Sequence, residues 1–241
     1  MTINITKTVR EFAVELPEAT RVFEKLGIDY CCGGEKPLRE ACLAAGVPTD
    51  KVLALLEQAG NSAAGSDETP GWNSAPLSDL TAYIVTKHHV FTREELPRLN
   101  QLLAKVCSVH GEKHPELRKL QVIFQGLQEE LTGHMFKEEQ ILFPYIENLE
   151  TAVTHGDPVP TPFFGTVRNP VRMMMQEHDN AGQALRGLRE ASSNYRVPAD
   201  GCISFRTLYQ ALEEFEKDLH QHIHLENNIL FPRAAELEAG A

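Results

Sequence analysis

The sequence predicts an all-α protein in which four long helices form a bundle behind a small helical N-terminal domain. Four long segments after residue 76 carry apolar side chains at helical spacing, and no stretch has the alternating pattern of a strand. An eleven-residue motif occurs twice, as HMFKEEQILFP at residues 134–144 and as HIHLENNILFP at residues 222–232. The repetition indicates a duplicated helical hairpin, and long helices joined by loops favour a four-helix bundle.

The chain divides into three parts. Residues 1–59 contain short helical patterns around the cysteine turn DYCCGG, with Gly27 as a helix stop, and predict a small helical domain. Residues 60–76, GNSAAGSDETPGWNSAP, are poor in hydrophobic side chains and predict a linker. Residues 77–241 form the predicted bundle.

Apolar periodicity places the four bundle helices at residues 77–107, 116–150, 171–195 and 202–238. Pro97 lies within the first of them and predicts a kink or a local interruption, because proline removes a backbone donor and clashes with the preceding turn. A proline-rich crossover at residues 154–170 separates the second helix from the third.

Composition narrows the classes of partner. The net charge is -11, with 23 Lys and Arg against 34 Asp and Glu and no basic block, so we expect neither nucleic acid nor an anionic membrane as a partner. No run of about 18 apolar residues occurs and the N-terminus lacks an apolar signal-peptide core, which predicts a cytoplasmic protein. Five cysteines, two of them adjacent, do not predict a disulfide framework and fit a reducing compartment.

Each copy of the repeated motif places a glutamate four residues after a histidine: Glu138 after His134, and Glu226 after His222. Residues four apart share one face of a helix, so each copy directs an imidazole and a carboxylate the same way. The apolar residues that follow continue much of that face. We therefore expect both pairs to point into the bundle, although a lone pair of this kind is usually a surface contact.

The first and third helices carry matching histidines, since His89 precedes His134 by 45 residues and His178 precedes His222 by 44. The predicted metal ligands are His89, His134, Glu138, His178, His222 and Glu226. Four imidazoles and two carboxylates suit two non-heme iron ions, with both carboxylates bridging and room for an oxo or hydroxo bridge and an exogenous ligand. Zinc is less expected, because it prefers four ligands and no cysteine is in register.

Other histidines lie near the predicted ligands. His88 points about 100° away from His89 on a helix, and the two spacings favour His89 as the ligand. His220 and His224 flank His222 at two residues on either side, off its face, and are expected to be solvated.

Three further groups have open roles. His110 lies in a loop and either approaches one end of the site or is exposed. Glu130 and Asp218 each stand four residues before a motif histidine. They are either acceptors that orient a ligand imidazole or exposed helical carboxylates.

Cys31 and Cys32 are adjacent in the turn DYCCGG. A disulfide prefers Cα atoms about 5.5 Å apart, whereas neighbours are held at about 3.8 Å, so the two thiols are not expected to bond to each other. On an exposed turn they would suit binding a soft metal, exchange with another thiol, or oxidation. The alternative is that they pack as small apolar residues.

The motifs DYCCGG, EHDNAG, HMFKEEQILFP and HIHLENNILFP together resemble the bacterial iron-sulfur cluster repair di-iron proteins, a hemerythrin-like family, over nearly the whole chain. The resemblance implies a hemerythrin-like bundle, a di-iron centre and restoration of clusters damaged by nitric oxide or oxidants. It also implies that the four histidines are terminal ligands, that Glu138 and Glu226 bridge, and that Cys31 and Cys32 are functional thiols. Oxygen-carrying hemerythrins use five His with one Asp and one Glu, so oxygen carriage is less expected.

Three functions are compatible with these residues. The protein could supply iron to damaged clusters, with iron-sulfur proteins or their apo forms as partners. It could instead reduce nitric oxide to nitrous oxide at the di-iron centre. A third hypothesis is a redox or gas sensor, with nitric oxide or oxygen as the small ligand and the N-terminal domain as output. A homodimer through the small domain is a further expectation from its size.

Overall fold

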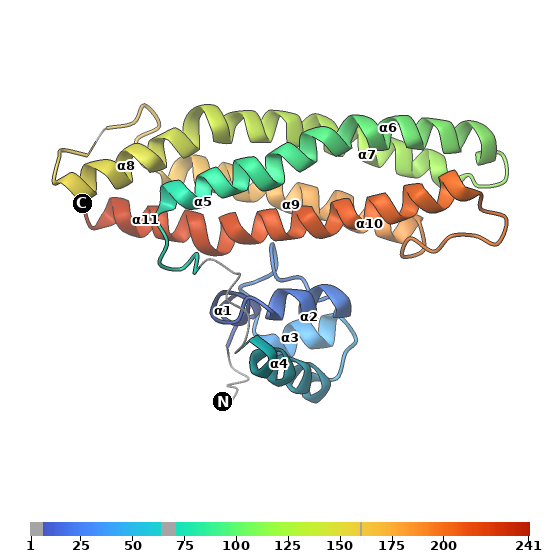
Figure 1. Ribbon diagram of the computed structural model, residues 1–241, viewed down its shortest axis with the longest axis horizontal. Helices are drawn as coiled ribbons and strands as arrows, with labels where there is room; N and C mark the ends of the chain where they lie inside the picture. Colours follow the sequence, from blue (N-terminus) through green and yellow to red (C-terminus); the bar gives the residue numbers. More distant parts are fainter. Residues whose placement is uncertain (1–6, 64–70, 160) are drawn as a thin grey trace.

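The computed structural model describes residues 7–63, 71–159 and 161–241 (Figure 1). Within these ranges every regular element is a helix, apart from one isolated β-bridge between Thr8 and Pro37. The all-α prediction is confirmed. None of the described helices is long and apolar enough to cross a membrane.

The small N-terminal domain contains four helices: α1 (Val9–Glu15), α2 (Ala19–Leu26), α3 (Leu38–Ala44) and α4 (Thr49–Ala63). The side chains of Thr8 and Glu11 each accept the backbone N–H of the other, which satisfies donors at the start of α1. Helix α2 ends at Gly27, which adopts a left-handed conformation with φ 66°, as the sequence predicted.

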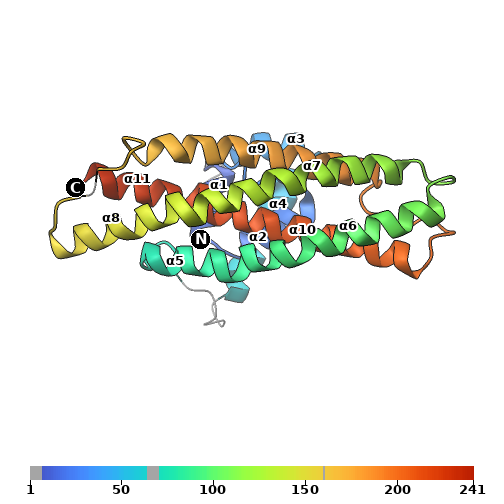
Figure 2. The ribbon, with the colours of Figure 1, turned by 90° about the horizontal axis from the view of Figure 1, so that it is seen from above.

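The bundle consists of four antiparallel rods that lie side by side (Figures 1 and 2). The first is α5 (Leu77–Tyr83), η1 (Ile84–His89) and α6 (Val90–His110); the second is α7 (Glu116–Lys137), η2 (Glu138–Leu142) and α8 (Phe143–His155); the third is α9 (Arg168–Ala191); the fourth is α10 (Ile203–His224), η3 (Leu225–Leu230) and α11 (Phe231–Ala239). Helix α6 continues through Pro97, so the proline does not interrupt it.

Three of the rods contain a π-helical turn, labelled η, that the sequence analysis did not predict. In η2 the N–H of Phe143 bonds to the carbonyl of Glu138, five residues back, and η3 repeats this arrangement. A proline follows the phenylalanine in both copies, Pro144 and Pro232. Because proline has no N–H and its ring clashes with the carbonyl four residues back, it favours this wider turn.

Two apolar clusters fill the bundle. One includes Leu99, Phe124 and Phe215 and extends into the small domain, and the other includes Ile84 and Ile146 near the end where the chain terminates. The predicted ligands lie along the rods between these two clusters, where apolar packing on both sides shields them from water.

Residues 60–63 and 71–76 of the segment predicted to be a linker lie within the described residues. Helix α4 extends to Ala63, beyond the predicted boundary at residue 60. After residue 70, Asn73 donates to the carbonyl of Val14 at 2.8 Å, and the Trp72 ring lies 4.8 Å from that of Tyr83. The end of this segment therefore contacts both domains.

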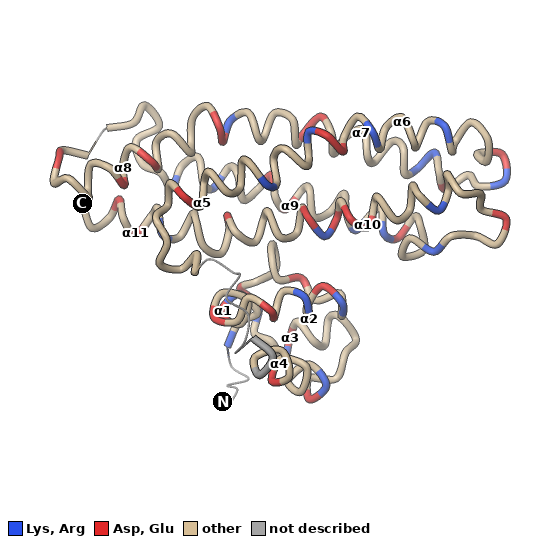
Figure 3. Tube along the Cα trace, in the orientation of Figure 1, with Lys and Arg blue, Asp and Glu red and all other residues tan. Residues whose placement is uncertain are grey.

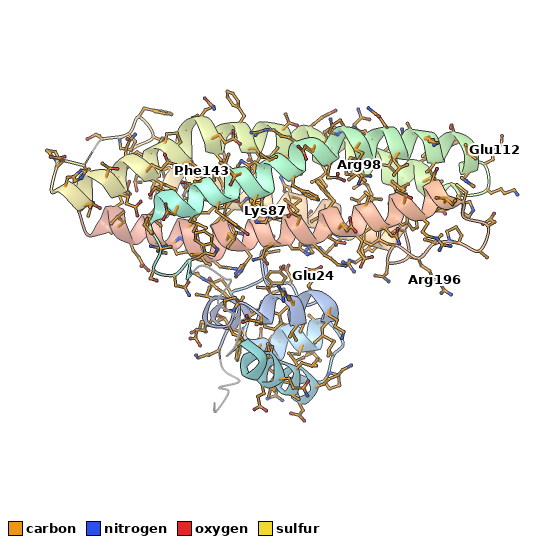
Figure 4. All side chains as sticks on the ribbon, in the orientation of Figure 1. Glu24, Lys87, Arg98, Glu112, Phe143 and Arg196 are labelled. Carbon is orange, nitrogen blue, oxygen red and sulfur yellow. The ribbon has the colours of Figure 1, made fainter. Side chains whose placement is uncertain are left out.

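The small domain docks beside α9, α10 and η3, and its cysteine turn projects toward them (Figure 1). Asn228 donates to the carbonyl of Tyr30 at 2.9 Å. Glu24, on the side of the small domain that faces the bundle (Figure 4), lies 2.9 Å from His220 and 3.8 Å from Arg189. Elsewhere, charged residues of both signs are distributed along the chain trace of both domains (Figure 3).

Candidate metal centre

The six predicted ligands meet in the bundle, and each is at most 2% exposed. They form two groups of four that share both glutamates, and within each group the ligand atoms lie within 4.8 Å of one another. The groups are His89, Glu138, His222 and Glu226, and His134, Glu138, His178 and Glu226.

The two oxygens of Glu138 face opposite halves of the site. Its Oε2 lies 3.4 Å from Nε2 of His89, and its Oε1 lies 3.2 Å from Nε2 of His134. The π-helical turn η2 begins at Glu138, directly after the helix that carries His134, so the predicted four-residue spacing is retained.

Glu226 repeats the arrangement from the other side. Its Oε1 lies 3.1 Å from Nε2 of His222, and its Oε2 lies 3.1 Å from Nε2 of His178. The histidines also face each other in pairs: Nε2 of His178 is 3.0 Å from that of His134, and Nε2 of His222 is 3.1 Å from that of His89. Each carboxylate therefore joins the two histidine pairs.

These separations fit metal coordination. Two ligand atoms at about 2.1 Å from an ion and at right angles to each other lie about 3.0 Å apart. Within the described residues, both oxygens of Glu138 and Oε2 of Glu226 are buried without a hydrogen-bond partner. Buried carboxylate oxygens of this kind are costly unless a cation satisfies them. Each group of four can thus hold a metal ion.

The buried histidines and glutamates of the two groups shift one another's pKa values. Burial by itself would lower the pKa of His134, but the adjacent Glu138 carboxylate raises that pKa to about 10. Burial lowers the pKa of His222. Burial also opposes ionisation of Glu226, but the nearby His222 and His178 hold its pKa well below the usual value. A coordinating imidazole is neutral, so an ion held by His134 would have to displace the proton that the raised pKa keeps there.

In two of the predicted ligands, the ring nitrogen that faces away from the site contacts a carboxylate. Nδ1 of His134 lies 2.8 Å from Oε2 of Glu177, which also binds Lys137. The hydrogen bond from His134 is the main reason that the pKa of Glu177 falls to about 2. Nδ1 of His89 lies 2.6 Å from Oε1 of Glu139, which an arginine of α6 also contacts. Such acceptors fix the tautomer of a ligand and strengthen its basicity.

The other two imidazoles are supported differently. Nδ1 of His178 lies 2.8 Å from the side-chain oxygen of Asn227. Nδ1 of His222 has no hydrogen-bond partner among the residues that the structure covers, and the ring of His88 stacks on it at 5.7 Å instead. Sequence reasoning missed Asn227, Glu177 and Glu139, although each directly follows or precedes a predicted ligand in the chain.

The structure places the groups whose roles were open. His88 is buried and its Nδ1 lies 3.1 Å from Oδ1 of Asp218, so neither group belongs to the metal cluster. Glu130 is exposed. His110 lies at the end of α6 with Nε2 3.1 Å from Sγ of Cys202, and it does not approach the site.

The expectation that His220 and His224 are solvated is wrong. His224 is 2% exposed, its ring lies 5.5 Å from that of Tyr30, and its Nδ1 lies 2.8 Å from Nδ2 of Asn228. His220 binds Glu24 at 2.9 Å. Both histidines lie on the face of the fourth rod that the small domain covers, and the helical pattern of that rod alone does not reveal this covering.

The cysteine turn is not the exposed turn that the sequence predicted. Cys31 is buried and Cys32 half-buried, because the turn packs on α9 beside the predicted ligand His178. Sγ of Cys32 lies 3.5 Å from the carbonyl oxygen of His178, and Asn227 donates to the carbonyl of Cys31 at 3.2 Å. Gly182 allows this approach, since a Cβ there would lie 3.3 Å from Sγ of Cys32.

Comparisons with known proteins agree with this architecture. Residues 80–234 match the hemerythrin HHE cation binding domain, and residues 5–60 match a domain of unknown function, DUF542. The chain is 37% identical over 222 residues to the iron-sulfur cluster repair protein YtfE of Yersinia pseudotuberculosis, covering 92% of this chain and 93% of that protein. It is 39% identical over 224 residues to YtfE of Edwardsiella ictaluri, covering 93% of this chain and 94% of that protein.

Proposed function

The chain belongs to the hemerythrin-like family of the YtfE iron-sulfur cluster repair proteins, and we propose that it repairs damaged clusters by supplying iron from two ions held at the six-residue site. The observation that carries this proposal is the placement of Glu138 and Glu226. In each of them, one carboxylate oxygen faces one histidine pair and the second oxygen faces the other pair. Two of the histidines would hold each ion, and both carboxylates would be shared between the two ions.

Supply requires that an ion can leave. Six protein groups do not fill the coordination of two iron ions, so positions remain for exchange. The half of the site formed by His134 and His178 lies against the cysteine turn, and Asn227 contacts both His178 and the carbonyl of Cys31. Movement of the turn would take the carbonyl of Cys31 away from the Asn227 amide. An amide without this acceptor is less firmly oriented toward Nδ1 of His178, which would weaken the hold of His178 on the ion. A protein with a damaged or empty cluster is the expected partner.

Iron transfer tests the proposal. Protein loaded anaerobically with Fe²⁺ is mixed with an apo iron-sulfur protein and sulfide, and iron in both proteins is followed after separation. We expect iron to move to the acceptor, and Glu138→Ala or Glu226→Ala to alter the rate of release. The exposed Glu190→Gln on α9 serves as the control. If iron stays bound while an acceptor is present, the supply function is refuted.

Reduction of nitric oxide is a second candidate, favoured by the shared carboxylates, which would hold two ferrous ions close together. Such ions, when bound, would supply two electrons, and with two protons from solvent two nitric oxide molecules would give one nitrous oxide and one water. Adding nitric oxide anaerobically to the reduced protein tests this: nitrous oxide in proportion to the protein supports it, and its absence rules it out. The two candidates separate, because supply removes iron from the protein and reduction leaves it in place.

A further inference from the structure

A second group of metal-binding side chains lies in the turn after α2. Asp29, Cys31 and Cys32 each offer one ligand atom, and these atoms lie within 4.8 Å of one another. Sγ of Cys31 lies 3.8 Å from Sγ of Cys32 and 3.6 Å from Oδ1 of Asp29. None of these residues belongs to the bundle site.

The separations match a tetrahedral ion. Two sulfur ligands at about 2.3 Å from a tetrahedral metal lie about 3.8 Å apart, and a sulfur and an oxygen at about 2.1 Å lie about 3.6 Å apart. A disulfide would require about 2.05 Å between the sulfurs, so the two thiols are in contact without being bonded. The three side chains could therefore bind a metal ion together without a prior rearrangement of the turn.

Backbone hydrogen bonds hold the carboxylate in place. Oδ1 of Asp29 accepts the N–H groups of Cys31, Cys32 and Gly33, at 3.3, 3.0 and 2.9 Å. Gly33 leaves room for this close approach, since a Cβ there would lie 3.1 Å from Cγ and Oδ2 of Asp29. All three backbone donors use Oδ1, and a carboxylate offers about four lone-pair positions over its two oxygens, so Oδ2 keeps lone pairs for a cation.

The thiols can be reached from outside. Both cysteines line a cavity of about 460 Å³ beside Asn227 and also border a smaller one of about 130 Å³ on the side of Asp29. On the bundle side, Sγ of Cys32 lies 3.5 Å from the carbonyl oxygen of His178. The group thus stands between the outside and the histidine pair that contains His178.

We propose that Asp29, Cys31 and Cys32 bind one divalent transition-metal ion, with a fourth position open, and that this site receives Fe²⁺ as it leaves the bundle. Binding replaces the two thiol protons, and no electron is transferred. The resulting complex of one M²⁺ with three anionic ligands carries one negative charge, which Arg186 offsets with Nη1 3.6 Å from Oδ2 of Asp29. The receiving role rests on the proposed iron supply, whereas the binding does not.

Cobalt tests the binding. Co²⁺ is added anaerobically to the full-length protein already loaded with iron, and thiolate-to-cobalt charge-transfer absorption is recorded. We expect saturation at one equivalent per chain, loss of the band in Cys31→Ser and Cys32→Ser, and its retention in Cys42→Ser, a matched change of a buried thiol in the same domain. No band in the wild-type protein, or a band that survives in the double Cys31→Ser, Cys32→Ser variant, overturns the proposal.

Asp29→Asn guards against a folding defect, because the amide keeps an oxygen for the three backbone donors and removes only the charge. It should weaken cobalt binding by about 10-fold or more. In wild type, cobalt should slow alkylation of Cys32; unchanged alkylation counts against the site. If cobalt binds but Asp29→Asn transfers iron to the apo acceptor as fast as wild type, the receiving role is refuted. If wild type transfers no iron at all, the supply function fails, and the cobalt band alone decides the site.

Discussion

Replacing Glu177 should weaken metal binding although this residue lies outside the ligand set. Its Oε2 is 2.8 Å from Nδ1 of His134, and Lys137 binds its other oxygen. The hydrogen bond from His134 lowers its pKa to about 2, so it is ionised at neutral pH. Glu177→Gln keeps an oxygen that can accept the Nδ1–H and removes the charge, and Glu177→Ala removes both.

The size of the effect follows from the contact. Hydrogen bonds to charged groups contribute about 1.5–3 kcal/mol and neutral ones about 0.5–1.5 kcal/mol, a difference of about 1–1.5 kcal/mol. At about 1.4 kcal/mol for each factor of ten, Glu177→Gln should lower metal affinity about tenfold. The side chain is 26% exposed, so solvent screening places the result at or below this value. Loss of the acceptor in Glu177→Ala should lower the affinity by up to about 100-fold.

Competition with a chelator measures the metal affinity of the Glu177 variants. Metal-free protein is titrated anaerobically with Fe²⁺ or Co²⁺ in the presence of a chelator of known affinity, and Glu190→Gln, an exposed carboxylate of the same helix, is the control. The expected order of affinity is wild type and Glu190→Gln, then Glu177→Gln, then Glu177→Ala. If both Glu177 variants bind as tightly as the control, Glu177 does not support His134 in the way inferred.

Three further predictions concern the contact between the domains. The pKa of Glu24 is lowered from 4.5 by its hydrogen bond with His220 against the effect of burial, and the pKa of His220 is raised from 6.5 by Glu24, also against burial. The pair should therefore stabilise docking fully between about pH 4.5 and 6.5. The stabilisation should decrease as the pH falls through the lowered pKa of Glu24, and also as it rises through the raised pKa of His220. Limited proteolysis between the domains, measured against pH, checks this. Gly182→Leu should displace the cysteine turn and speed alkylation of Cys32, because a Cβ alone already lies 3.3 Å from its sulfur. Asn227→Leu should leave Nδ1 of His178 and the carbonyl of Cys31 without their hydrogen-bond partner. Each loss should lower the free energy of unfolding by about 1–3 kcal/mol, and each kcal/mol lowers the melting temperature by about 2–4 °C.

Matched variants decide these three cases. Glu24→Gln should flatten the pH profile, and an unchanged profile would show that another contact controls docking. Gly126→Leu on α7, where a Cβ meets nothing within 4 Å, should leave Cys32 alkylation unaltered, so equal rates in the two leucine variants would contradict the argument. The exposed Asn148→Leu should melt like wild type, and Asn227→Leu should not.

The local pattern of the chain was sufficient to predict the helices and the register of the ligand candidates. His134 and Glu138 are four residues apart on one helix, so helical geometry alone places them on a common face. Duplication then pointed to His89 and His178, and the structure brings all six side chains together. Their role as iron ligands stays a prediction that metal analysis has to test.

Contacts between distant segments could not be predicted in this way. The acceptor of His134 is Glu177, on another rod. A proline follows η2 and η3 but not η1, so the proline alone does not mark the π-helical turns in the sequence. Sequence patterns record the period of an element and not the partner that covers it, so His224 appeared solvated.

The sequence by itself therefore determined the helical class, the family and the ligand spacing, because periodicity and motif spacing are properties of single segments. Only the tertiary structure decided that His89 pairs with His222 and His134 with His178, and that Cys31 and Cys32 pack beside His178. Both depend on how the rods and the small domain dock, and docking buries surfaces whose complementarity is defined in three dimensions and not along the chain.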